Sequence, residues 1–370
     1  MLLNCMGIII LKYASSNISY SGLGALEFFK DIPIALMSLV AVNLINKYGT
    51  KASLLFALTF VFICCAIIPF MDDFWFLRVW FAIIGISFAI AKISIFAIIR
   101  NNSVDEKELS KVMTAVEASF MIGLFCVNIG FGLLLNSHYD MYWKFGFWLI
   151  AILSLITLLL LKNRDYKEVP SDTTSLIGNY KEIFSFRNVI FFTIPFLIVF
   201  IEQGFNSWLP LFHKENLGFN SFYALQSAAF LALFSFIGRI ITSKLITKVN
   251  WWKYISFAII GGITLMVIIQ LLISNINGNL GILLFLLPLL GLFLSPLYPL
   301  YNSKFLIGIN QKKINIFISL VVIFSSLGGS FGSLMMAYVF EFSLGDYFIL
   351  FSLLPLILIF IMSIFFIRRG

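Results

Sequence analysis

The chain has 370 residues, of which 61% are hydrophobic and only 11% are charged, and its mean hydropathy is +1.02. A soluble globular domain has about half apolar and about a quarter charged residues, so this composition excludes a soluble protein. The formal net charge of +8 arises mainly from short segments between apolar runs. Such loops favour contact with anionic lipid head groups over binding to nucleic acid.

Apolar runs long enough to cross a bilayer, which takes about 20 helical residues, occur along the whole chain. We predict twelve membrane helices, over residues 2–16, 19–45, 52–71, 76–99, 112–135, 145–162, 188–211, 222–246, 252–274, 279–300, 314–340 and 346–367. Lys12 interrupts the first of them, and Met1 already lies in apolar sequence. We therefore expect helix 1 to be short or truncated. A cleaved signal peptide is the less favoured interpretation, because no basic region precedes the apolar run.

Basic residues gather in alternate loops, which fixes the expected orientation. Clusters occur at 47–51, 100–111, 162–187, 239–253, 304–313 and 368–369, whereas the other loops carry acidic residues such as Asp72, Asp140 and Asp346. Short loops rich in Lys and Arg remain on the cytoplasmic side, so the C-terminus is predicted to be cytoplasmic. Helical spans belong to an inner or plasma membrane, since outer-membrane proteins are barrels.

The longest polar stretch, residues 162–187, divides the chain into two predicted six-helix halves, 1–161 and 188–370. Corresponding loops of the two halves have similar sequences, NLINKYGTK at 43–51 and SKLITKVNWWK at 243–253. Internal repetition of this kind is typical of secondary transporters, whose substrate site forms between the repeats near the middle of the bilayer.

The first of these loops resembles the signature that follows the second helix in the major facilitator superfamily. Leu44, Lys47, Gly49 and Lys51 fit the pattern, while Val42, Asn46 and Thr50 replace its first glycine, its aspartate and an arginine. Gly238 and Arg239 stand where this superfamily often has a second copy. The resemblance implies an all-α membrane protein of twelve helices in two six-helix bundles. It also implies a role in gating for Asn46, Lys47, Gly49, Lys51, Gly238 and Arg239.

Two further strings, EQGFNSWLP at 202–210 and GLFLSPLYP at 291–299, are similar to the fucose permease-like branch of that superfamily. The resemblance implies proton-coupled uptake of sugars or other small solutes across a bacterial inner membrane by alternating access, with helices 1, 4, 7 and 10 lining the cavity. Pro296 and Pro299 are expected to break helix 10 and to form a gating hinge, because proline removes a backbone donor.

A charged side chain at the centre of a membrane helix costs about 3 kcal/mol on insertion scales, so each one requires an explanation. Lys92 requires a partner from another helix, a bound anion or a water-filled cavity. Glu202 and Asn206 share one face of helix 7. The predicted substrate-binding set is Lys92, Glu202, Gln203, Asn206, Trp208, Gln226, Tyr298 and Tyr301. The alternatives are helix packing for the polar members and interfacial belts for the aromatic ones.

Four carboxylates are candidates for proton coupling: Glu27, Asp31, Glu117 and Glu202. Glu27, Lys30 and Asp31 share one helix face, and they form either a self-paired structural cluster or a proton-transfer site. Glu117 alternatively pairs with a nearby basic residue. Because Lys92 suggests a substrate with an acidic group, a second solute class is an alternative. It is an anionic metabolite or a metal chelator, imported or exported by proton coupling.

Enzyme chemistry has no support in the sequence. The only histidines are His138 and His213, both in predicted outer loops, and no Walker motif or paired metal ligands occur. The cysteines lie in apolar stretches without metal-type spacing (Cys5, Cys64, Cys65 and Cys126). We therefore expect no cofactor, metal or disulfide. The expected partners are a small solute, protons and the lipid bilayer, and the expected state is a monomer. A membrane sensor without transport activity is the alternative from another class.

Overall fold

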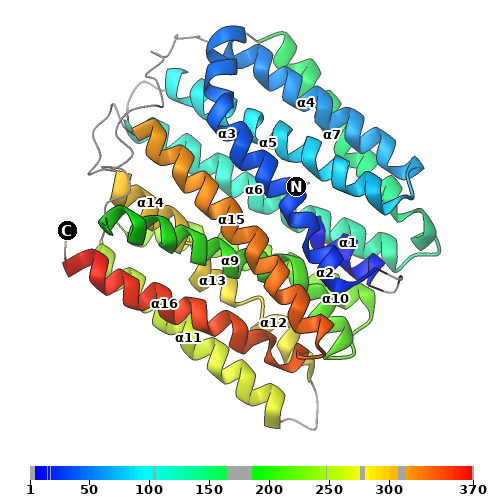
Figure 1. Cartoon of the computed structure of the whole chain (residues 1–370), viewed down its shortest axis with the longest axis vertical. Coiled ribbons are helices and arrows are strands. Elements are labelled where there is room, and N and C mark those ends of the chain that lie inside the picture. Colours follow the sequence, from blue (N-terminus) through cyan, green and yellow to red (C-terminus); the bar gives the residue numbers. More distant parts are fainter. Residues whose placement is uncertain are drawn as a thin grey trace.

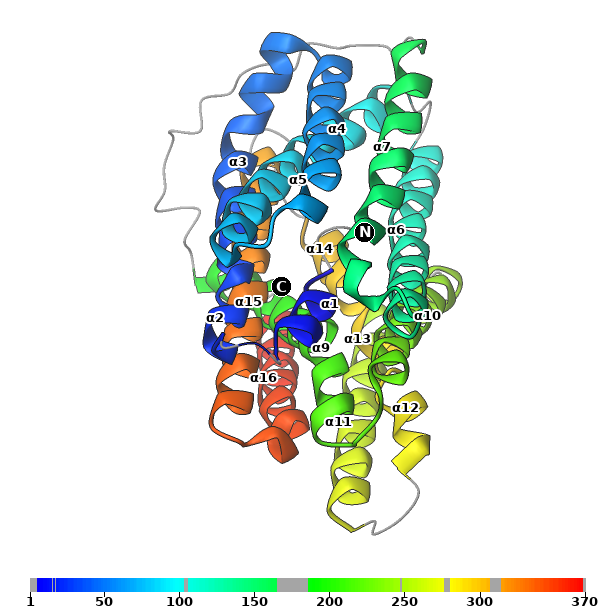
Figure 2. The same cartoon turned by 90° about the vertical axis from the view of Figure 1, so that its right-hand side faces the viewer.

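The computed structural model describes residues 5–14, 16, 18–102, 106–164, 186–246, 248–275, 280–306 and 314–368. These residues form helices and short connections, with no β-strand among them. Most of the long helices run alongside one another (Figure 1). We call residues 6–162 the N-terminal half and residues 186–368 the C-terminal half. In Figure 2, α3, α4 and α7 lie in the upper part of the molecule, and α11, α12 and α16 lie in the lower part.

The N-terminal half contains α1 (Met6–Tyr13), α2 (Tyr20–Gly24), α3 (Leu26–Tyr48), α4 (Thr50–Ile67), α5 (Phe74–Asn102), α6 (Glu106–Leu135) and α7 (Gly146–Lys162). The C-terminal half contains α9 (Phe186–Glu215), α10 (Ser221–Leu245), α11 (Trp251–Asn275), α12 (Leu283–Leu286), α13 (Leu290–Leu294), α14 (Leu297–Leu306), α15 (Ile314–Glu341) and α16 (Phe348–Arg368). These elements follow the twelve predicted segments in order, with α1 as the short first helix.

Nine helical stretches within the described residues are long and apolar enough to cross a membrane. Large apolar side chains remain exposed on their outer faces, among them Leu160 and Phe257, each 67% exposed. An apolar surface of this extent suits contact with lipid rather than with water.

Helix 10 differs most from its prediction, because the chain breaks it into α12, α13 and α14. Pro288 lies between α12 and α13, and Pro296 lies between α13 and α14. Proline cannot donate a backbone hydrogen bond, so the expected break at Pro296 is confirmed and Pro288 adds a second. The expected break at Pro299 is wrong. Pro299 lies in the first turn of α14, where a backbone N–H has no intrahelical acceptor in any case.

The two ends of the bundle differ in charge. We call the end with the connections at 71–73, 136–145, 216–220 and 342–347 the acidic end, and the opposite end the basic end. At the acidic end, Lys144 Nζ donates to the backbone oxygen of Met71 at 2.6 Å and to Asp72 Oδ1 at 2.7 Å. This contact holds the pKa of the exposed Asp72 carboxyl below its usual value.

The two halves meet at the acidic end, where α1 packs on α9 and α2 packs on α15. Tyr20 Oη donates to Glu215 Oε1 at 2.8 Å, and the backbone N–H of Ser21 donates to Glu341 Oε2 at 2.6 Å. A Cβ added at Gly24 would lie 2.6 Å from the Cβ of Ala337. Close backbone approach and polar contacts thus join the halves here.

Glycines allow α15 to approach α9 closely. A Cβ at Gly332 would lie 2.1 Å from the carbonyl oxygen of Phe200. We predict that Gly332→Ala lowers the free energy of unfolding by about 1–3 kcal/mol, because the extra methyl group forces packed backbones apart. Thermal unfolding in detergent measures this effect. Gly130→Ala is the matched control, since a Cβ there meets nothing within 4 Å. Equal unfolding temperatures for the two variants would contradict the packing argument.

Candidate functional site

A cavity of about 370 Å³ lies between the two halves and receives side chains from both. From the N-terminal half, α3, α5 and α6 contribute Lys30, Asp31, Ile34, Phe88, Ala91, Lys92, Ile95, Val116, Phe120 and Met121. From the C-terminal half, α9, α10, α14 and α15 contribute Val199, Glu202, Gln203, Asn206, Arg239, Tyr298, Val322, Ser325, Ser326 and Gly329. The wall therefore carries cations, carboxylates and neutral polar groups within an otherwise apolar bundle.

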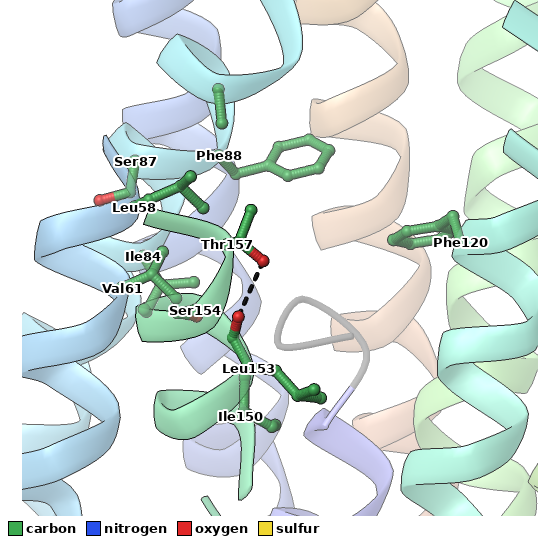
Figure 3. A pocket seen from close by; sticks show the side chains of 11 residues that line it. Leu58, Val61, Ile84, Ser87, Phe88, Phe120, Ile150, Leu153, Ser154 and Thr157 are labelled. Atoms are coloured by element: carbon green, nitrogen blue, oxygen red, sulfur yellow. Dashed lines mark hydrogen bonds between the residues drawn. The ribbon is translucent and has the colours of Figure 1, made fainter. Parts of the chain in front are cut away.

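A second hollow, also of about 370 Å³, lies between α4, α5, α6 and α7 (Figure 3). Its described lining contains no charged residue. Two of its hydroxyl groups bond within their own helices, since Ser87 Oγ donates to the Ile83 oxygen and Thr157 Oγ1 to the Leu153 oxygen, both at 2.8 Å. We call this hollow the apolar groove. The cavity between the halves, with its charged wall, is the candidate functional site.

Five residues of the predicted substrate-binding set line this cavity: Lys92, Glu202, Gln203, Asn206 and Tyr298. They come from α5, α9 and α14, which correspond to helices 4, 7 and 10 of the predicted topology. Lys92 Nζ lies 5.7 Å from the centroid of the Phe88 ring, within the range of a cation–π contact. Separate segments of the sequence thus converge on one site.

Three other predicted residues lie outside the cavity lining. Trp208 is fully buried, and its Nε1–H donates to Ser333 Oγ at 2.9 Å. Tyr301 is also buried, and its hydroxyl bonds with that of Ser363. A Cβ added at Gly132 would lie 2.7 Å from Gln226 Nε2, where α10 packs on α6. These contacts are helix packing, which is the alternative expected for Gln226, whereas interfacial belts were the alternative for Trp208 and Tyr301. We leave all three residues out of the proposed binding set.

Glu27, Lys30 and Asp31 form a buried ion cluster near the beginning of α3, with exposures of 0%, 3% and 5%. Lys30 Nζ donates to the Glu27 carboxylate and lies 3.6 Å from Asp31 Oδ1. Lys30 and Asp31 line the cavity, whereas Glu27 is not part of its lining. The cluster is therefore self-paired, as one interpretation of the sequence expected, and it also faces the site.

The C-terminal half completes this ion cluster with hydrogen bonds that the sequence did not predict. Gln203 Nε2 donates to Glu27 Oε1 at 2.7 Å, and Ser207 Oγ donates to the same oxygen at 2.8 Å. Ser330 Oγ donates to Asp31 Oδ2 at 2.8 Å. The carboxylates of α3 thus tie the two halves together through α9 and α15. We call these six residues the inter-half network: Glu27, Lys30, Asp31, Gln203, Ser207 and Ser330.

Glu117 and the predicted gating residues take varied positions. The side chains of Glu117 and Asn46 lie outside the described residues. Lys47 is exposed, with Nζ 5.2 Å from the centroid of the Tyr48 ring. Gly49 ends α3 at a φ of 86°, a conformation that L side chains rarely adopt. This conformation explains why the motif has a glycine at this loop position. The role of Gly49 in gating stays a prediction.

The remaining motif residues, Lys51, Gly238 and Arg239, lie in three different surroundings. Lys51, in the first turn of α4, is half-buried. A Cβ added at Gly238 would lie 2.7 Å from the carbonyl oxygen of Leu292, so this glycine allows α10 to approach α13. Arg239, predicted only for gating, faces the cavity.

The expectation that His213 lies in an outer loop is wrong. α9 continues through Pro210 to Glu215, so His213 is a helical residue with 0% exposure. Its Nδ1 lies 2.9 Å from the backbone oxygen of Leu209, and its Nε2 lies 3.4 Å from that of Leu283. Across the described part of the chain, no cluster of His, Cys, Asp and Glu could hold a metal ion.

A sequence model of the Major Facilitator Superfamily matches residues 5–333. No curated protein matches the chain. Among solved structures, the Escherichia coli fucose:proton symporter aligns with a TM-score of 0.68 at 17% identity, covering 98% of this chain and 95% of that one. A D-xylose–proton symporter aligns with a TM-score of 0.75 at 15% identity, covering 98% and 96%.

A human organic anion transporter aligns with a TM-score of 0.65 at 15% identity, covering 97% of this chain and 88% of that one. At these identities the similarity concerns the fold. It agrees with the twelve-helix architecture predicted from the apolar segments. Together with the match over residues 5–333, it shows that the chain belongs to the Major Facilitator Superfamily and is a multi-pass membrane protein, a secondary transporter rather than an enzyme.

Proposed function

We propose that the protein takes up a small polar solute by alternating access, coupled to the entry of protons. The observation that carries this proposal is the cavity, to which both halves contribute charged and polar side chains. A site shared between two halves is exposed to one side of the membrane or the other when the halves rock about it. The fucose:proton and D-xylose–proton symporters, which share this fold, support the proposal.

Asp31 is the proposed coupling carboxylate. A coupling group must be reached from the cavity, and its protonation must favour one arrangement of the halves over the other. Asp31 lines the cavity and accepts a hydrogen bond from Ser330 of the opposite half. Protonation removes its attraction for Lys30 and weakens the bond from Ser330. Glu27 is held outside the cavity lining by Gln203 and Ser207, which suits a structural role.

Glu202 is the second carboxylate of the cavity lining, next to Gln203 and near Asn206 on α9. We assign Glu202 and Asn206 to the solute, because they supply acceptors and a donor on the polar side of the cavity, whereas Gln203 Nε2 donates to Glu27. Glu117 stays a candidate from the sequence alone.

The orientation follows from loop charge, with the basic end and the C-terminus in the cytosol of a bacterial cell. The inter-half network then lies toward the outer side, because α3 begins at the acidic end and Glu27 lies in its first turn. In this arrangement the network closes the outer gate. We expect the protein to act as a monomer, because the two halves of one chain both line the cavity.

Solute-induced proton movement tests the proposed function. Purified protein in liposomes is supplied with sugars, small carboxylates and iron chelators in turn, while a dye reports the external pH. We expect one solute class to make the outside alkaline, and a protonophore to abolish the signal. Liposomes without protein are the control. If a solute binds but neither it nor protons cross the membrane, the protein is a sensor and the proposal fails.

A further inference from the structure

We infer that the solute is an amphiphilic organic monoanion, with its negative group between Lys92 and Arg239 and its apolar part between Phe88 and Phe120. This inference rests on the proposed transport function and names the substrate class of the same cavity.

Each half contributes a cation to the cavity wall at the proposed anion site. Lys92 belongs to α5 and Arg239 to α10, and both line the cavity. A guanidinium group can form two parallel hydrogen bonds with a carboxylate, and an ammonium group adds a compact positive charge. An anion that contacts both residues connects the two halves, as the occluded state of a carrier requires.

The two sides of the cavity also differ in polarity. Apart from Lys30, Asp31 and Lys92, the described lining from the N-terminal half is apolar, with Ile34, Ile95 and Met121 among its members. The lining from the C-terminal half is mainly polar, with Gln203, Asn206, Tyr298 and Ser325 among its members. A polyol lying against the apolar side would leave buried hydroxyl groups without partners, which is costly. A molecule with one polar end and one apolar end matches both sides.

The apolar side of the cavity continues into the apolar groove. Phe88, Ala91 and Phe120 line both the cavity and the groove. Figure 3 shows the rings of Phe88 on α5 and Phe120 on α6 pointing toward one another. Because Lys92 lies one turn beyond Phe88, a ligand held at the ammonium group can extend its apolar part past the two rings toward Leu58 and Leu153.

An anionic substrate also agrees with proton coupling at Asp31. The cavity wall contains three cations, Lys30, Lys92 and Arg239, and two carboxylates, Asp31 and Glu202. A proton taken up by Asp31 offsets the charge of the incoming anion. Binding of the anion and binding of the proton then favour each other, which is the thermodynamic requirement for symport.

Binding to the purified protein in lipid nanodiscs tests the inference without requiring transport. Octanoate, butyrate, 1-octanol and L-fucose are titrated by calorimetry, with empty nanodiscs subtracted. We expect octanoate to bind more than tenfold tighter than butyrate, since each buried methylene is worth about fourfold in affinity. Lys92→Gln and Arg239→Gln should each weaken octanoate binding about tenfold, as loss of a charged hydrogen bond does, without affecting octanol.

A pair of matched variants on α5 tests the apolar part. Ala91→Phe fills the passage between cavity and groove, whereas Ile86→Phe adds a ring at a position that is 39% exposed and outside both linings. We expect Ala91→Phe to bring the octanoate affinity down to that of butyrate. Ile86→Phe should change neither affinity.

Three results would overturn the inference: absence of octanoate binding, octanoate binding that neither cation variant weakens, or binding of fucose in place of the acids. Measuring transport of the solute and of protons separates failure of this inference from failure of the proposed function. Octanoate that binds as expected but never moves with protons leaves the ligand class intact and removes the transport proposal. Proton-coupled movement of a sugar keeps the transport proposal and removes the anion.

Discussion

Asp31→Asn will abolish solute-driven alkalinisation outside liposomes while the variant continues to exchange solute across the membrane. Asparagine has nearly the size of aspartate and retains an acceptor for Ser330 Oγ, which lies 2.8 Å from Asp31 Oδ2 in the wild-type chain. An amide cannot take up a proton in this pH range, so the coupling step is lost while the cavity remains. Proton movement should fall to the rate of liposomes without protein.

Counterflow of labelled solute, which requires no net proton movement, shows whether the Asp31→Asn protein is folded and able to exchange. Asp140→Asn serves as the control, because its side chain is 49% exposed at the acidic end and lies outside the cavity lining. Glu202→Gln is the informative comparison within the cavity. If Asp31→Asn still moves protons and Glu202→Gln does not, Glu202 is the coupling carboxylate and the assignment to Asp31 is wrong.

The helical architecture could be predicted from the sequence, because a bilayer requires long apolar segments and tolerates few charges within them. The predicted segments 222–246 and 252–274 are observed as Ser221–Leu245 and Trp251–Asn275. The exceptions follow from backbone chemistry. Pro288 and Pro296 divide helix 10, and α9 extends through Pro210, so that His213 is buried instead of lying in a loop.

The candidate site could be predicted only in part. Lys92 and Glu202 were found because charged groups in membrane helices are costly and therefore conspicuous. Trp208 is a candidate only because it lies on helix 7, which is expected to line the cavity. The sequence does not reveal whether a side chain on that helix faces the cavity or a neighbouring helix. Ser207 and Ser330 were missed, since serine is common in membrane helices and its hydroxyl bonds as often to its own backbone as across an interface.

The inter-half network yields the largest predicted effect on stability. Lys30→Met leaves the carboxylates of Glu27 and Asp31 buried beside each other, with exposures of 0% and 5%, and removes the cation between them. Removing one partner of a buried ion pair typically costs about 3–5 kcal/mol, because the remaining charge is uncompensated. We expect the free energy of unfolding in detergent to fall by about this amount.

Two further variants show that the loss arises from buried charge. Lys12→Met removes a cation that is 27% exposed and 3.4 Å from Asp140 Oδ2, and such a surface pair contributes about 1 kcal/mol or less. Glu27→Gln combined with Lys30→Met removes one of the two buried carboxylates that lose their cation. This double variant should therefore be more stable than Lys30→Met alone. If Lys30→Met and Lys12→Met unfold at the same temperature, Lys30 does not compensate the buried carboxylates of Glu27 and Asp31. If the double variant is the least stable of the three, the hydrogen bonds that Gln203 and Ser207 donate to the Glu27 carboxylate contribute more to stability than the charge of Lys30 does. The network then stabilises the closed outer gate mainly through these hydrogen bonds.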